Sequence, residues 1–110
     1  MILCCKIQEN KAPDVEIVEI PDSVYVKDRV VIKAKAVDME GDAVSVRVDY
    51  GDGIVSEFSP YFRSGSIISF EHTYTFRGDY WVRVQAKDDQ ENFSLWSGGN
   101  LLRVLILGQQ

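Results

Sequence analysis

The sequence predicts an all-β fold, an antiparallel β-sandwich of seven strands, and two observations carry this prediction. Apolar and polar residues alternate with period 2 over most of the chain, and clusters of Gly, Pro, Asp, Asn and Ser interrupt the alternation about every 8–12 positions. No segment shows a sustained apolar stripe of period 3.6, so we expect no helix longer than a turn or two. The chain of 110 residues is long enough for one domain with its own core.

Three strands are expected in the N-terminal half of the chain. "VEIVEI", residues 15–20, is the first, and Pro21 closes it. Residues 29–38 are the second, with apolar side chains on one face and two lysines on the other. The acidic turn 38–42 leads to the third, residues 43–50, in which valines alternate with Ser, Arg and Asp. Each of the last two strands therefore has one buried and one solvated face.

Four more strands are expected in the second half. Residues 53–58 read as a short return strand, and residues 66–74 place Ile, Phe, His and Tyr on one face. A tight corner at 77–79 leads into residues 80–88, and residues 101–107 form the last strand after a loop rich in Asp, Asn, Ser and Gly. The inward side chains of these strands should form the core: Val30, Ile32, Ala34, Val46, Val48, Phe70, Tyr74, Tyr80, Val82 and Val84.

Charge and composition exclude several classes of protein. The formal net charge is −5 and the 12 basic residues are scattered, whereas nucleic-acid binding requires clustered Lys and Arg, so we expect no nucleic-acid partner. The two cysteines, Cys4 and Cys5, are adjacent, and together with a single histidine they are too few for a zinc site.

The stretch "DYGDG", residues 49–53, resembles a phosphate-binding loop only superficially. It lacks the Lys-Ser/Thr and the following helix of a P-loop, and the βαβ context of a dinucleotide site. Gly51 and Gly53 permit positive φ in a turn, and Asp52 can accept hydrogen bonds from neighbouring backbone N–H groups. We therefore interpret it as a structural corner.

The acidic turn 38–42, "DMEGD", is the best candidate for a metal site. Asp38, Glu40 and Asp42 could present oxygen ligands to Ca²⁺, with Asp88 and Asp89 across the same end of the sandwich. An EF-hand is excluded because its 12-residue loop and closing Glu are absent. The alternative is a solvated acidic turn that binds nothing. No other cofactor is expected.

His72 invites a catalytic interpretation that the sequence does not support. It lies on the apolar face of its strand, and no nucleophile motif such as G-x-S-x-G accompanies it. We expect a core imidazole that is hydrogen-bonded to backbone. No catalytic residue is assigned.

Five aromatic residues are candidates for a binding surface. Trp81 should face outward, because its neighbours Tyr80 and Val82 face the core. The other four lie in or beside loops: Phe58, Tyr61, Phe62 and Trp96. Two interpretations stay open, contact with a partner or burial under a loop. The 58–65 loop is the expected internal cover of Trp81, and the tether 1–12 is the next.

The N-terminal residues 1–12 lack periodicity and read as a flexible tether to a domain at 13–110. "MILCC" resembles the end of a lipoprotein signal, with Cys4 or Cys5 as the lipidated residue, although the charged region and the long apolar run of a signal are missing. A frayed terminus is the alternative. Membrane contact is expected only through such a lipid anchor.

The ordered series "DYGDG", "HTY", "GDYWVRVQAKD" and "SLWS" resembles the polycystic kidney disease (PKD) domain family, from about Val30 to Leu107. The resemblance implies an immunoglobulin-like, PKD-type, antiparallel seven-stranded β-sandwich. Tyr80 matches the position of a tyrosine corner, whose hydroxyl bonds to upstream backbone.

Two aromatic positions depart from the family pattern. The usual Trp before the turn is Val48 here, and the following Phe is Tyr50. Phe70 and Tyr74 are therefore expected to pack the core beneath the turn.

The resemblance implies a non-catalytic extracytoplasmic module, at the cell surface or secreted, that makes protein or polysaccharide contacts or acts as a spacer. Two alternatives stay open. One is a self-associating structural protein that pairs through Trp81 and the face of Val31 and Val37. The other is a small hydrolase with paired carboxylates about 5–9.5 Å apart, such as Glu40 and Asp88. The oligomeric state is not predicted.

Overall fold

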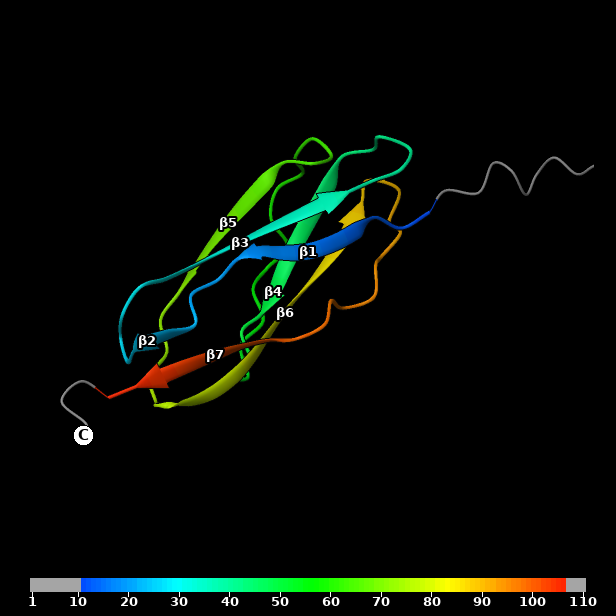
Figure 1. Ribbon diagram of the computed structural model, residues 1–110. Helices are drawn as coiled ribbons and strands as arrows, with labels where there is room; N and C mark the ends of the chain where they lie inside the picture. The colour runs from blue at the N-terminus through cyan, green and yellow to red at the C-terminus, as the bar shows by residue number, and fades with distance from the viewer. Residues whose placement is uncertain (1–10, 107–110) are drawn as a thin grey trace, which may run out of the picture.

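Two β-sheets pack face to face in the computed structural model, which describes residues 11–106 (Figure 1). One sheet has the strand order β1-β3-β5 and the other β2-β7-β6-β4. The strands are β1 (Asp14–Glu19), β2 (Ser23–Tyr25), β3 (Val30–Val37), β4 (Val44–Asp49), β5 (Ile67–His72), β6 (Gly78–Asp88) and β7 (Asn100–Leu105). The predicted seven-stranded, all-β sandwich is confirmed.

Strand pairing differs from the prediction in two places. The pairs are antiparallel except β2 with β7, which run parallel. The predicted return strand at 53–58 is wrong, because only an isolated bridge between Asp49 and Val55 forms there. The seventh strand is instead β2, whose three residues are too few to show an alternation.

The segment after the corner lies along the outer edge of β4 and is held by serines. Ser59 N–H donates to the Val46 carbonyl at 2.8 Å, and Ser59 Oγ accepts from Val46 N–H at 3.1 Å. One residue thus satisfies both backbone groups of a strand residue. The same two-point pairing joins Ser56 to Val48, Ser94 to Ala86 and Ser97 to Val84. Two segments of the form Ser-x-aromatic-Ser therefore close the two edges of the β4–β6 ribbon.

The core lies between the sheets and matches the expected inward positions, apart from two aromatic residues. Eight of the ten expected residues are buried, and Val82 and Ile32 are fully so. Phe70 and Tyr80 are only half-buried and pack against the edge of the core. Phe70 lies on β5, an edge strand with one neighbour. Tyr80 forms the expected tyrosine corner: its hydroxyl donates to the Phe76 carbonyl at 2.7 Å. This hydrogen bond holds the ring at the edge of the core.

The corner at 49–53 is structural, as predicted. Gly51 and Gly53 adopt φ of 85° and 92°, and a Cβ on Gly51 would lie 2.6 Å from the Trp81 carbonyl oxygen. Asp52 accepts from Ile54 N–H at 3.2 Å. The DYGDG stretch therefore combines a left-handed backbone with a close approach to β6.

The partner expected for His72 was wrong. Its Nε2 lies 2.7 Å from Asp52 Oδ2 rather than on a backbone group. The imidazole stacks on the Tyr50 ring at 3.8 Å and contacts the edge of Tyr74 at 4.8 Å. Tyr74 is buried beneath the corner, as expected, and donates to the Tyr50 carbonyl at 2.8 Å. The Asp52–His72 pair thus fastens the corner after β4 to the end of β5 in the opposite sheet.

None of the described residues forms a helix long and apolar enough to cross a membrane.

Candidate metal centre and outer surface

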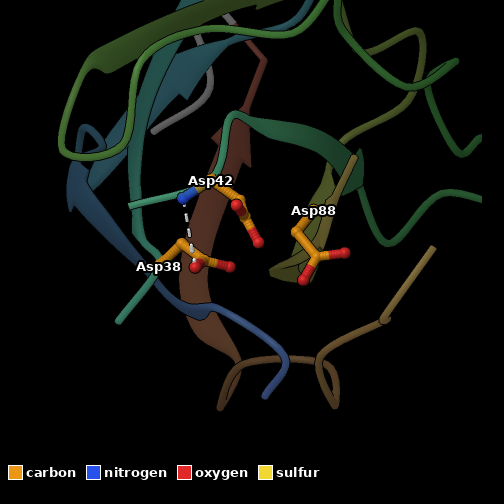
Figure 2. A group of neighbouring side chains, drawn as sticks. All are labelled: Asp38, Asp42 and Asp88. Atoms are coloured by element: carbon orange, nitrogen blue, oxygen red, sulfur yellow. Dashed lines mark hydrogen bonds between the residues drawn. The ribbon is translucent and has the colours of Figure 1, made fainter. Parts of the chain in front are cut away.

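Three of the five acidic residues considered as metal ligands meet at one end of the sandwich (Figure 2). Carboxylate oxygens of Asp38, Asp42 and Asp88 lie within 4.8 Å of one another. Asp38 follows β3 directly, and Asp88 is the last residue of β6 and pairs with Val44. Glu40 is exposed at the tip of the turn and does not belong to the cluster.

The strand pattern explains why these carboxylates are buried. Asp38 continues the inward series of β3, and Asp88 continues that of β6 after Val84 and Ala86. Both therefore occupy core positions at the same end of the two sheets, where Asp38 is 4 % and Asp88 is 0 % exposed. A carboxylate at such a position requires hydrogen bonds or a cation to offset its lost hydration.

The two buried aspartates organise their loops in the same way. Asp38 Oδ1 accepts from the N–H groups of Glu40 at 2.9 Å and Asp42 at 3.3 Å. Asp88 Oδ1 accepts from those of Gln90 and Asn92, both at 2.9 Å. In each loop, one carboxylate oxygen of the aspartate accepts hydrogen bonds from the backbone N–H groups two and four residues later. The second oxygen of each aspartate takes no part in these two pairs of backbone hydrogen bonds.

The second oxygens differ in their surroundings. Asp88 Oδ2 accepts from Asn92 Nδ2 at 3.2 Å. Asp38 Oδ2 is buried and has no hydrogen-bond partner among the described residues. Figure 2 shows this oxygen turned toward the carboxylates of Asp42 and Asp88. A buried oxygen without a donor in the protein requires a further partner, which is either water or a cation.

Electrostatics favour a cation at this point. Two ionised carboxylates at this separation repel by about 3 kcal/mol at an effective dielectric constant of about 20. Calcium binds six to eight oxygens at about 2.3–2.6 Å, so opposite ligands lie up to about 5 Å apart. The 4.8 Å limit of the cluster fits that span. The three carboxylates thus match the charge and the ligand type that Ca²⁺ requires.

Trp81 faces outward, as predicted, and the 58–65 loop does not cover it, contrary to expectation; residues 1–10 of the tether, the second expected cover, lie outside the described residues. Trp81 is 60 % exposed on β6, and the 58–65 loop lies along β4 instead. Two glycines lie close to Trp81: Gly51 meets its backbone, and a Cβ on Gly99 would lie 3.3 Å from its ring. The Trp81 ring therefore has a residue without a side chain beside it, Gly99.

Two of the other predicted aromatic residues, Phe58 and Trp96, lie against cations of the outward face of β4 and β6. Arg47 lies over the rings of Phe58 at 4.8 Å and Trp96 at 5.1 Å. Arg83 lies over Trp96 at 4.8 Å, and Lys87 over Phe58 at 4.5 Å. Trp81, Arg83 and Lys87 are alternate residues of β6, so they lie on the same face of the sheet. This period-2 spacing is the sequence feature from which the grouping could have been predicted.

The remaining candidate residues for a binding surface, Tyr61 and Phe62, are partly exposed. Tyr61 and Phe62 are about two-fifths exposed, at 43 % and 40 %, and the Tyr61 hydroxyl donates to the Asp88 carbonyl at 3.3 Å. Trp96 also lines an open pocket of about 360 Å³ between residues 12–15 and 93–97. Cys4 and Cys5 lie outside the described residues.

The fold and the two loops define an immunoglobulin-like sandwich module with a carboxylate cluster at one end. The family model of the PKD domain matches residues 10–94. The chain therefore belongs to the PKD domain family, and its PKD-type immunoglobulin-like fold is confirmed. A search of curated proteins finds no match.

Solved structures show the same fold. The PKD domain of an M14-like peptidase from Thermoplasmatales archaeon SCGC AB-540-F20 is 26 % identical, with a TM-score of 0.81 over 88 % of this chain and 99 % of that one. The CARDB domain of the PF1109 protein from Pyrococcus furiosus, in complex with di-metal ions, is 19 % identical, with a TM-score of 0.57 over 90 % and 99 %. The PKD domain of the human VPS10 domain-containing receptor SorCS2 is 19 % identical, with a TM-score of 0.51 over 100 % and 85 %.

Proposed function

We propose that this chain is a non-catalytic, extracytoplasmic module that binds Ca²⁺ through Asp38, Asp42 and Asp88 and supplies protein or polysaccharide contacts, or spacing, at the cell surface. One observation supports the calcium site above all others. The buried Asp38 Oδ2 lacks a hydrogen-bond partner among residues 11–106 and faces two further carboxylates. Membership of the PKD domain family supports the non-catalytic, extracytoplasmic part.

The position of the cluster supports a role in spacing. Asp14 pairs with Val37, so the start of β1 lies beside the loop that begins at Asp38. The two ends of the described chain lie at opposite ends of the sandwich (Figure 1). Calcium would join the loop after β3 to the loop after β6 at the end where β1 begins. This would stiffen the end of the module at which the described chain enters it.

Isothermal titration calorimetry with CaCl₂ tests the calcium site. We expect one Ca²⁺ per chain, with a Kd of about 10⁻⁴–10⁻³ M, as in extracellular modules, and much weaker binding of Mg²⁺. Asp38→Asn should abolish the binding, because it removes one ligand charge and replaces the orphaned oxygen. Asp89→Asn is the matched control, since Asp89 is an exposed neighbour outside the cluster. Absence of heat from the wild-type chain at about 10 mM Ca²⁺ would reject the site.

A lipid anchor on Cys4 or Cys5 is a separate part of the proposal. One acyl chain gives only marginal membrane binding, so stable attachment requires a second signal. Intact mass spectrometry of the protein isolated from its native membrane fraction should show an acylated cysteine. Unmodified cysteines on a protein from the cytoplasmic fraction would contradict both the anchor and the location.

A further inference from the structure

The outer face of the β4–β6 ribbon carries a local excess of positive charge. Its outward charged residues at paired positions of β4, β6 and β7 are Arg47, Arg83, Lys87 and Arg103, against Asp49 and Asp79. The whole chain has a formal net charge of −5. These positions thus carry four cations against two carboxylates, a formal excess of +2, although the protein as a whole is acidic.

Two of these cations form no ion pair with a carboxylate of the part of the chain that the structure describes. Asp49 pairs with Arg83 at 3.1 Å and Asp79 with Arg103 at 3.7 Å. Within residues 11–106, no carboxylate lies within ion-pair distance of Arg47 or Lys87. The charges of Arg47 and Lys87 are thus available to an anionic partner.

Aromatic rings hold these two cations in place without neutralising them. Arg47 lies between the rings of Phe58 and Trp96, and its Nε and Nη2 donate to Gln85 Oε1 at 3.0 and 2.7 Å. Lys87 lies over Phe58 and within 5.8 Å of the Phe93 ring. Such contacts reduce the number of conformations that each long side chain must lose on binding an anion.

Trp81 extends the same face along β6. Trp81, Arg83, Gln85 and Lys87 are alternate residues of one strand, so they form a straight row about 20 Å long. Trp81 is 60 % exposed, and Gly99, which lies beside its ring, has no side chain that could cover it. An exposed indole provides a flat apolar platform with a polar N–H, of the kind that stacks on sugar rings.

We propose that this face, defined by Trp81, Arg83, Lys87, Arg47, Phe58 and Trp96, binds an acidic polysaccharide. Its carboxylate or sulfate groups would meet Arg47 and Lys87, and one of its sugar rings would stack on Trp81. The inference rests on the proposed function and specifies the chemistry of its partner. The backbone argues against an acidic peptide that adds as a strand, because the two Ser-x-aromatic-Ser segments close the edges of this ribbon. An acidic peptide that binds through its side chains alone is an outcome of the test below.

Affinity electrophoresis in native gels tests the proposal. The probes are hyaluronan for carboxylates, dextran sulfate for sulfates, neutral dextran as a blank and poly-glutamate as an acidic peptide. We expect the wild-type chain to be retarded by hyaluronan or dextran sulfate, which identifies the anionic group, and not by dextran. Raising NaCl to about 0.5 M should weaken the retardation, because salt screens exposed charges.

Paired variants locate the surface. Arg47→Gln/Lys87→Gln should weaken binding by about tenfold. The matched control, Lys33→Gln/Lys35→Gln, makes the same change of charge on the other sheet and should bind like the wild type. Lys87→Gln alone should weaken binding by an intermediate amount. This single variant is included because the loss of Arg47 could disturb the packing of the rings around it. Trp81→Ala should weaken polysaccharide binding and leave the melting temperature nearly unchanged.

Three results would overturn the inference. They are no retardation of the wild-type chain by either acidic polysaccharide, equal losses in the two double variants, and binding to poly-glutamate that matches polysaccharide binding and is insensitive to Trp81→Ala. Calcium titration of the same samples keeps the two proposals apart. Intact calcium binding without polysaccharide binding would reject this surface alone.

Discussion

Ser97 and Val84 are hydrogen-bonded to each other twice. Ser97 N–H donates to the Val84 carbonyl at 2.8 Å, and Val84 N–H donates to Ser97 Oγ at 2.9 Å. Val84 is fully buried in the middle of β6, at a point where β7 has already ended its pairing with that strand. Ser97 therefore makes the two backbone hydrogen bonds with Val84 that a neighbouring strand would otherwise make at this edge of the sheet.

Ser97→Ala should destabilise the domain by about 1–3 kcal/mol, because it leaves the buried N–H of Val84 without its acceptor. Urea unfolding measures this loss, and hydrogen exchange should show faster exchange at the Val84 amide. Ser69→Ala is the control, since Ser69 is an exposed residue of β5. Equal unfolding free energies for the two variants would show that the serine contacts do not stabilise the edge.

Gly51→Ala should destabilise the domain more than Gly53→Ala. Both glycines have positive φ, so both substitutions carry a backbone cost of about 1 kcal/mol. Only at Gly51 would the new Cβ also collide with the Trp81 carbonyl oxygen, at 2.6 Å, whereas nothing lies within 4 Å at Gly53. Thermal unfolding of the pair isolates this close approach. Equal melting temperatures would contradict it.

The stability of the domain should fall above about pH 10. Burial, and next the negative charge of Asp52, raises the pKa of Tyr50 and the pKa of Tyr74 above the ordinary value of 10.0. Because the folded state holds these phenol protons more tightly, their contribution is fully present below pH 10 and is lost as the pH rises above it. Urea unfolding between about pH 8 and pH 11 measures this slope.

Tyr74→Phe separates the titration from the hydrogen bond. The variant loses the bond to the Tyr50 carbonyl and should be less stable at pH 8, yet its stability should fall less steeply above pH 10. Tyr25→Phe, which changes an exposed tyrosine, is the control. An alkaline slope as steep in Tyr74→Phe as in the wild type would remove Tyr74 from this account.

The strands that could be predicted were those with one face against the core. In β3, β4 and β6, buried residues occur at every second position, so the alternation gave both the strand and its face. The strand predicted at 53–58 does not form, because this segment is hydrogen-bonded to β4 only at every third residue, through Ser56, Ser59 and Phe62. Strand β2 could not be found, since its parallel partner lies about 80 residues further along the chain.

The sequence pattern explains the convergence of the two carboxylates that continue a strand, and it gives no position for Glu40 in the turn. Asp38 and Asp88 extend inward series, so their convergence follows from the pairing of the sheets. Glu40 lies in the turn, where no strand alternation fixes the direction of its side chain. Its backbone N–H donates a hydrogen bond to Asp38. The partner of His72 was missed because Asp52 reaches it only after the chain folds back from β4 to β5. Contacts that depend on loop conformation leave no periodic signal in the sequence.

The melting temperature of Asp38→Asn, measured with EDTA and with about 10 mM Ca²⁺, tests the calcium site most directly. In EDTA the variant should melt above the wild type, because it removes one of three repelling carboxylates and places an amide donor where Asp38 Oδ2 has no partner. With Ca²⁺ the order should reverse: about 10 mM is roughly 10–100 times the expected Kd, so binding adds about 1.4–2.7 kcal/mol to the wild type alone. A wild-type melting temperature that Ca²⁺ does not change, or a variant less stable than the wild type in both conditions, would contradict the calcium site.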